Sequence, residues 1–210
     1  MKLDAPATPG KHFSMLREFH LADFVTLGNG GCGVIAIFFC LAYANAGARH
    51  DIYIAAGLVV PALVLDIMDG VIARSRHQSS VLGRELDSLA DVISFGVTPA
   101  VIAHAIGLNS LLDSTALVFF TLCGLSRLAR YNVSAEALSQ AGKVRYYEGT
   151  PIPTSVIPLG ILLLAFHYHR YAPIEIAGQR FDLAVLPFVI SGCLMVHEVP
   201  DLQLARAHDG

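Results

Sequence analysis

The sequence predicts an all-α, polytopic membrane protein with about six transmembrane helices, and composition supplies the first observation. Of the 210 residues, 54% are hydrophobic and only 15% are charged, whereas soluble domains carry about 25% charged residues. The mean hydropathy is +0.58. A spanning helix needs roughly 20 apolar residues, so six would use about 120 of the chain. These values exclude a disordered chain, a coiled coil and an ordinary cytosolic enzyme.

The apolar runs give the predicted elements in order. Residues 24–48 contain no charged residue and no histidine, which predicts the first span. The run 52–65 is too short to span, so the second helix must carry Asp66 and Asp69 into or near the membrane. Asp87 and Asp91 likewise precede the third run, 92–112. The remaining predicted spans are 115–128, 152–169 and 183–199.

The predicted domain organisation is a single membrane domain over residues 22–200. Residues 1–21 form a short, amphipathic, cytoplasmic N-terminal segment without the continuous apolar region of a signal peptide, and residues 201–210 form a C-terminal tail. With both termini inside, only three cations lie outside, namely Arg49, Arg170 and Arg180. The other eleven lie inside, and these are Lys2, Lys11, Arg17, Arg74, Arg76, Arg84, Arg127, Arg130, Lys143, Arg145 and Arg206. The positive-inside rule therefore puts the four aspartates at the cytoplasmic side.

Two classes of function are disfavoured by charge and cysteine content. The net charge of −3 gives no electrostatic argument for binding nucleic acid. The four cysteines lie in apolar stretches and form no CxxC pair, so we interpret them as packing residues rather than metal ligands or a disulfide framework.

The segment from Asp66 to Asp91 carries the chemistry. On a helix, Asp66 and Asp69 share a face because they are three residues apart, and Asp87 and Asp91 share a face at a spacing of four. Small residues that leave room for a ligand lie beside these acids, namely Gly70, Ala73 and Gly83. Two helices joined by a tight loop would present all four carboxylates to one cavity.

Four acids cannot all stay ionised at the membrane edge without strong positive compensation. Arg74, Arg76 and Arg84 are near in sequence, but arginines alone would form a salt-bridged plug. Two Mg²⁺ or Mn²⁺ ions, which prefer carboxylate and phosphate oxygens, would compensate the negative charge better. The alternative is that the acids cap helices and pair with arginines at the interface.

Eight positions at fixed spacing resemble the signature of the CDP-alcohol phosphatidyltransferase family, D-x2-D-G-x2-A-R-x8-G-x3-D-x3-D. The matching residues are Asp66, Asp69, Gly70, Ala73, Arg74, Gly83, Asp87 and Asp91. The resemblance implies a six-helix membrane fold, usually a homodimer. It also implies transfer of a phosphatidyl group from CDP-diacylglycerol to an alcohol, with release of CMP, in the cytoplasmic (inner) membrane with the active site facing the cytoplasm.

The resemblance further implies a role for each matching residue. Asp66, Asp69 and Asp87 would hold the first metal ion, Asp87 and Asp91 the second, and Asp91 would be the general base. The nucleotide and pyrophosphate contacts would be Thr26, Gly70, Ala73, Arg74, Ser80 and Gly83.

Three further stretches, the first of which overlaps the end of the signature, resemble membrane-embedded bacterial phosphatidylserine synthases, so serine is the expected acceptor. They are LDSLADVISFGVTPA (86–100), SRLARYNV (126–133) and GTPIPT (149–154). Tyr131 and Thr150 depart from the common residues of that group. Residues expected to bind the serine carboxylate or the lipid phosphate are Arg127, Arg130, Lys143 and Arg145.

Alternatives remain open at this point. The acceptor could instead be glycerol 3-phosphate, an inositol phosphate or choline, and the four cations could merely follow the positive-inside rule. A small cation transporter is the alternative from another class, but it would place acids near the midplane and show inverted repeats, and no repeat is visible. Nucleic acid is not an expected partner.

Overall fold

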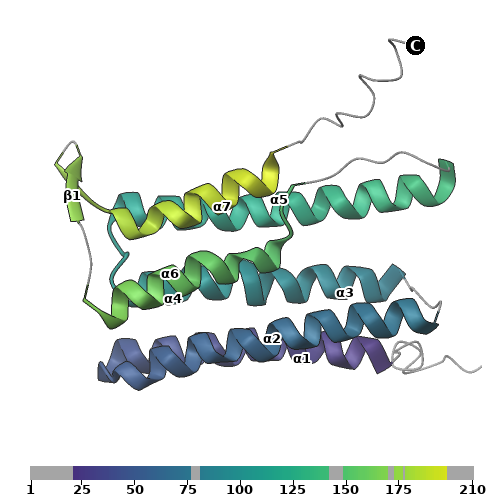
Figure 1. Cartoon of the computed structure of the whole chain (residues 1–210), viewed down its shortest axis with the longest axis horizontal. Helices are drawn as coiled ribbons and strands as arrows, with labels where there is room; N and C mark the ends of the chain where they lie inside the picture. The colour runs from purple at the N-terminus through teal and green to yellow at the C-terminus, as the bar shows by residue number, and fades with distance from the viewer. Residues whose placement is uncertain (1–20, 77–80, 142–148, 170–172, 177, 198–210) are drawn as a thin grey trace, which may run out of the picture.

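A computed structural model describes residues 21–76, 81–141, 149–169, 173–176 and 178–197. The helices run along the long axis of the molecule, as Figure 1 shows. Their bounds are α1 Leu21–Ala46, α2 Arg49–Arg76, α3 Val81–Asp91, α4 Thr98–Ala105, α5 Leu111–Ala141, α6 Val156–His167 and α7 Leu186–Val196. Between α3 and α4 the chain forms one turn of π-helix, η2 (Val92–Val97), and 3₁₀ turns η3 (Ile152–Ser155) and η4 (Leu183–Val185) precede α6 and α7.

The structure supports a membrane helical bundle but does not confirm six spans. Four segments are long and apolar enough to cross a bilayer, namely Ala22–Ala46, Arg49–Ile72, Leu82–Ala105 and Leu111–Ser134. The other two expected spans form shorter apolar helices, α6 with 12 residues and α7 with 11. At 1.5 Å per residue, α6 rises only roughly 18 Å, less than the bilayer core.

A β-hairpin is the one departure from the all-α prediction within the described residues. Strands β1 (Pro173–Ile176) and β2 (Gln179–Asp182) pair antiparallel. Gly178 adopts a φ of +76°, which a residue with a side chain rarely takes, and this closes the turn. The expected N-terminal segment and C-terminal tail lie outside the described residues.

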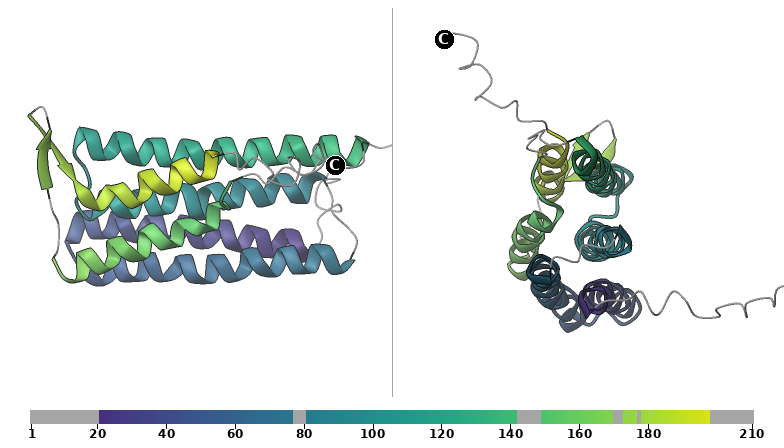
Figure 2. Two further views of the ribbon diagram at one scale, coloured as in Figure 1. Left: turned by 45° about the horizontal axis from the view of Figure 1, so that its top comes forward. Right: turned by 90° about the vertical axis from the view of Figure 1, so that its right-hand side faces the viewer.

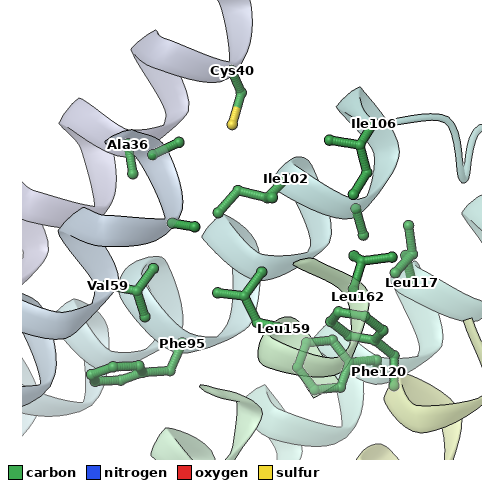
Figure 3. Close-up of a cluster of buried hydrophobic side chains, with 14 of the residues drawn as sticks. Ala36, Cys40, Val59, Phe95, Ile102, Ile106, Leu117, Phe120, Leu159 and Leu162 are labelled. Carbon is green, nitrogen blue, oxygen red and sulfur yellow. The ribbon is translucent and has the colours of Figure 1, made fainter. Parts of the chain in front are cut away.

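Seen end-on, the helices form two rows, with α1, α3 and α5 in one and α2, α6 and α7 in the other (Figure 2). The buried apolar core includes Phe95 of η2, Ile102 of α4, Phe120 of α5 and Leu162 of α6 (Figure 3). The Phe120 ring meets that of Phe188 on α7 edge-on, at 5.3 Å between centroids. This core holds α6 and α7 over the half of the bundle away from the α2–α3 junction (Figure 1).

Large apolar side chains cover much of the outer surface, which is the inverse of a soluble protein. Phe24, Phe38 and Leu122 are all more than half exposed, while the polar Asn29 is fully buried. Lipid tails satisfy exposed apolar groups, and polar groups turn inward to find partners. The exposed apolar side chains are therefore suited to contact with the lipid of a bilayer.

Helix α1 packs against η2 and α4 through small residues and hydroxyl groups. Ser94 Oγ donates to the Asn29 carbonyl oxygen at 2.9 Å, and Thr98 Oγ1 donates to the Gly33 carbonyl oxygen at 3.1 Å. A β-carbon on Gly33 would lie 2.8 Å from Ser94 Oγ and 3.0 Å from its Cα. Close approach of this kind is how helices associate in lipid. We call residues 29–33 and 94–98 the α1–η2 seam.

We expect Gly33→Ala to lower stability by about 1–3 kcal/mol, because the added methyl group overpacks against the Ser94 backbone, which cannot move aside. The measurement is thermal unfolding in detergent, followed by circular dichroism. Gly31→Ala is the matched control, since a β-carbon there would meet nothing within 4 Å. Equal melting temperatures for the two variants would contradict the importance of the seam.

Candidate active site

The acids predicted to act together lie on two neighbouring helices. Asp66 and Asp69 lie in the second half of α2, and Asp87 and Asp91 lie in the last two turns of α3. One carboxylate oxygen from each of Asp66, Asp69 and Asp87 lies within 4.8 Å of the others. Asp91 joins them through a contact between its carboxyl group and that of Asp66. The sequence-predicted juxtaposition of all four acids is therefore present, and we call these residues the acid array.

The array is largely shielded from water. Asp69 and Asp91 are each only 6% exposed, and Asp66 and Asp87 are half-buried. The Oδ1 atom of Asp87 is buried and has no hydrogen-bond partner in the described part of the chain. An isolated ionised carboxylate is costly in such surroundings unless a cation or donors compensate it.

The donor set fits a divalent cation. The three grouped oxygens are close enough for one ion to be shared among them, and carboxylates are the ligands that Mg²⁺ and Mn²⁺ prefer. The unpartnered oxygen of Asp87 is a free ligand at the same place. An ion pair between His50 and Asp51 lies at the other end of α2, away from the acids. The side chains of Arg74 and Arg76, which the alternative interpretation pairs with the acids, lie outside the described residues.

Helix α1 supplies hydrogen-bond donors to two of the acids. The Thr26 hydroxyl donates to Asp69 Oδ2 at 2.6 Å, and the Asn29 amide donates to Asp91 Oδ1 at 3.1 Å. These two residues are three apart, so they face the array from successive turns of one helix. The nucleotide contact expected for Thr26 stays a prediction, but the structure adds this contact with Asp69.

Asn29 is the site residue that sequence reasoning missed. The signal available was a polar side chain one helical turn after Thr26, inside a stretch without any charge. Its partner Asp91 lies 62 positions away in sequence, so no local spacing could reveal the contact.

The other predicted site residues fall into three groups. Gly70 and Gly83 lie half-buried beside the acids on α2 and α3. Ala73 and Arg74 belong to the last turns of α2, where only the backbone is described. Ser80, Lys143 and Arg145 lie outside the described residues.

The two predicted arginines of α5, Arg127 and Arg130, lie half-buried on that helix. The Arg127 guanidinium stacks over the Tyr131 ring at 5.7 Å. One turn further, Asn132 Nδ2 donates to Ser88 Oγ at 3.0 Å and to Glu85 Oε2 at 3.3 Å. These bonds tie the arginine-bearing end of α5 to α3, one turn before Asp91.

The fold and the array together define a class of protein: an integral membrane protein with a buried carboxylate site suited to divalent cations. The CDP-alcohol phosphatidyltransferase family profile matches residues 19–197. The chain therefore belongs to the CDP-alcohol phosphatidyltransferase family, as the signature indicated.

Three curated relatives share the name CDP-diacylglycerol–serine O-phosphatidyltransferase. The protein from Saccharomyces cerevisiae is 40% identical over 197 residues, covering 88% of this chain and 71% of the relative. The protein from Bacillus subtilis is 32% identical, covering 80% of this chain and 85% of the relative. The protein from Methanocaldococcus jannaschii is 31% identical, covering 91% of this chain and 90% of the relative. No solved structure gives a significant match.

We expect Thr26→Val to weaken Mn²⁺ binding about tenfold, the effect typical of losing a bond that orients a ligating carboxylate. Thr26→Ser keeps the hydroxyl and should bind as the wild type does. Titration calorimetry or Mn²⁺ electron paramagnetic resonance in detergent measures the affinity.

Thr121→Val is the matched control for this substitution. The Thr121 hydroxyl bonds only carbonyl oxygens, of Leu117 and Gly96, and no bond links it to the acids. An unchanged Mn²⁺ affinity in Thr26→Val would mean that the bond to Asp69 does not orient a metal ligand.

Proposed function

We propose that this protein transfers the phosphatidyl group of CDP-diacylglycerol to the hydroxyl group of L-serine, forming phosphatidylserine and CMP. The observation that carries the proposal is the acid array, because it brings the family's fixed aspartates together at the α2–α3 junction. The shared name of the curated relatives supports serine as the acceptor.

The proposed cofactor is a pair of divalent ions, Mg²⁺ or Mn²⁺. Asp66, Asp69 and Asp87 hold the first ion, and Asp87 and Asp91 hold the second. When bound, the ions neutralise the pyrophosphate and make CMP a better leaving group. The grouped oxygens and the unpartnered Asp87 Oδ1 support this assignment.

Asp91 is the proposed general base. The acceptor oxygen attacks the phosphorus that bears the diacylglycerol group, and its proton passes to the Asp91 carboxylate. The bond between that phosphorus and the bridging oxygen breaks, and CMP departs with the electron pair. Asp91 suits this role because it is buried and held by Asn29, which fixes the carboxylate in one orientation.

The nucleotide and pyrophosphate lie against the small residues beside the acids. Glycines and an alanine allow a ligand to approach the helix backbones, and an arginine binds phosphate by a bidentate fork. The residues proposed for this contact are Thr26, Gly70, Ala73, Arg74, Ser80 and Gly83.

Four basic residues are proposed to bind the serine carboxylate or the lipid phosphate, namely Arg127, Arg130, Lys143 and Arg145. Arg127 and Arg130 are three residues apart on α5, next to the Asn132 contacts with α3. Lys143 and Arg145 come from the segment after α5.

The active site is proposed to face the cytoplasm from an inner-membrane protein. Eleven of the fourteen cations lie in segments assigned to one side, which supports this orientation. A homodimer and a membrane domain over residues 22–200, flanked by the 1–21 segment and the 201–210 tail, remain predictions.

Purified protein in mixed micelles with Mn²⁺, CDP-diacylglycerol and labelled L-serine is expected to form labelled phosphatidylserine and CMP in equal amounts. Thin-layer chromatography and nucleotide analysis measure the two products. Turnover with glycerol 3-phosphate or inositol phosphate but none with serine would reject the acceptor while keeping the reaction class.

Asp91→Asn is expected to reduce kcat by at least a hundredfold, because an amide cannot accept the hydroxyl proton. Binding of Mn²⁺ at the first metal site, formed by Asp66, Asp69 and Asp87, should persist in a calorimetric titration. Asp51→Asn, at the opposite end of α2, is the matched control and should retain turnover. Near-normal activity of Asp91→Asn would exclude Asp91 as the base.

A further inference from the structure

Asn29 is a fully buried polar side chain of α1 that the proposed chemistry uses only to hold Asp91. It is 0% exposed. Burying an amide without partners for its polar atoms costs free energy. The side chain must therefore be explained by what each of its two polar ends contacts.

The two ends can be told apart by chemistry. The amide lies 3.1 Å from Asp91 Oδ1, and an ionised carboxylate only accepts hydrogen bonds, so the donor Nδ2 faces Asp91. The carbonyl oxygen Oδ1 then points away from that bond. It is buried and has no hydrogen-bond partner among the residues that the structure describes.

The backbone under Asn29 is fixed. Its carbonyl oxygen accepts the bond from Ser94 Oγ in the α1–η2 seam. Gly33 lies so close to Ser94 that a β-carbon there would clash, so α1 and η2 are in tight contact one turn after Asn29. Because η2 follows Asp91 directly, one rigid contact sets the positions of Asn29 and Asp91 together.

We propose that Asn29 Oδ1 binds the ammonium group of the acceptor, so that Asn29 and Asp91 together recognise a 2-amino alcohol. This inference rests on the proposed function. In serine the hydroxyl and ammonium groups stand on neighbouring carbons, and Asn29, whose Oδ1 has no partner among the described residues, contacts Asp91 directly. Asp91 receives the hydroxyl group, and Asn29 Oδ1 receives an N–H of the ammonium.

The neutral amide suits this task better than a fifth acid would. The array already holds four carboxylates, so another negative charge would compete for the metal ions. A carbonyl oxygen still forms a charge-assisted bond with an ammonium group, which is stronger than its bond with a hydroxyl group. Acceptors that carry a second hydroxyl in place of the amine would gain less at this position.

The test compares three molecules that differ only at the α-carbon. L-Serine carries an amine there, glycerate carries a hydroxyl group, and 3-hydroxypropionate carries only hydrogen. In the wild type, the inhibition constant of each analogue should be at least about tenfold higher than the KM for serine. Equal competition by 3-hydroxypropionate overturns the proposal without any variant.

Asn29→Ala and the similarly sized Asn29→Leu are expected to raise the KM for serine about tenfold or more, with less than a twofold change in the KM for CDP-diacylglycerol. The inhibition constant of 3-hydroxypropionate should stay at its wild-type value. Equilibrium dialysis of labelled serine in the presence of Mn²⁺ and CMP, without the lipid substrate, should show the same loss of affinity. Asn45→Ala, at the exposed far end of α1, is the matched control.

Two results overturn the proposal. An unchanged serine KM with reduced kcat would mean that Asn29 serves Asp91 alone. An equal loss of affinity for serine and 3-hydroxypropionate would mean that the substitution distorts the whole site. Wild-type protein that makes no phosphatidylserine would reject the proposed function as well, so the two failures are distinguishable.

Discussion

Four carboxylates confined between membrane-spanning helices set the constraint on which the rest of the structure depends. Each buried charge must be met by a donor or a cation, since lipid offers neither. Helix α1 answers part of this requirement with the Thr26 hydroxyl on Asp69 and the Asn29 amide on Asp91. In the described part of the chain α1 donates no such bond to Asp66 or Asp87, and these are two of the acids whose oxygens gather within 4.8 Å. Two acids of the array thus accept hydrogen bonds from α1, and the other two are left to bind cations.

That arrangement requires α1 to approach α3 closely. The α1–η2 seam permits it, because Gly33 has no side chain and the hydroxyl groups of Ser94 and Thr98 bond backbone carbonyl oxygens. The π-helical turn η2 contributes by adding a residue to the turn just after Asp91, which rotates Ser94 and Thr98 relative to the acids on α3. Without this local change in register, a straight helix would present the acids and the hydroxyl groups with a different angular offset.

Local spacing predicted the parts of the site that lie on one helix. Asp66 with Asp69, and Asp87 with Asp91, share faces because of helical periodicity, and the charges that end each apolar run locate α2 and α3. The Asn29–Asp91 contact was missed because it depends on the axial shift and rotation of α1 against α3. The 3₁₀ turns before α6 and α7 shortened two predicted spans, since hydropathy registers an apolar run without showing where regular helix begins. The hairpin escaped notice because four-residue strands give little periodic signal.

The apolar face of α2 beside the array has a consequence for kinetics. Ile67, Met68 and Val71 are each about half exposed, and they alternate along the helix with Asp66, Asp69 and Gly70. Acyl chains in the surrounding leaflet would lie against these side chains while a headgroup turns inward to the acids. A lipid substrate would then never leave the bilayer. For such a reaction the relevant concentration is the mole fraction of the lipid in the leaflet, so diluting the membrane with inert lipid would slow turnover even when the bulk amount of substrate is unchanged.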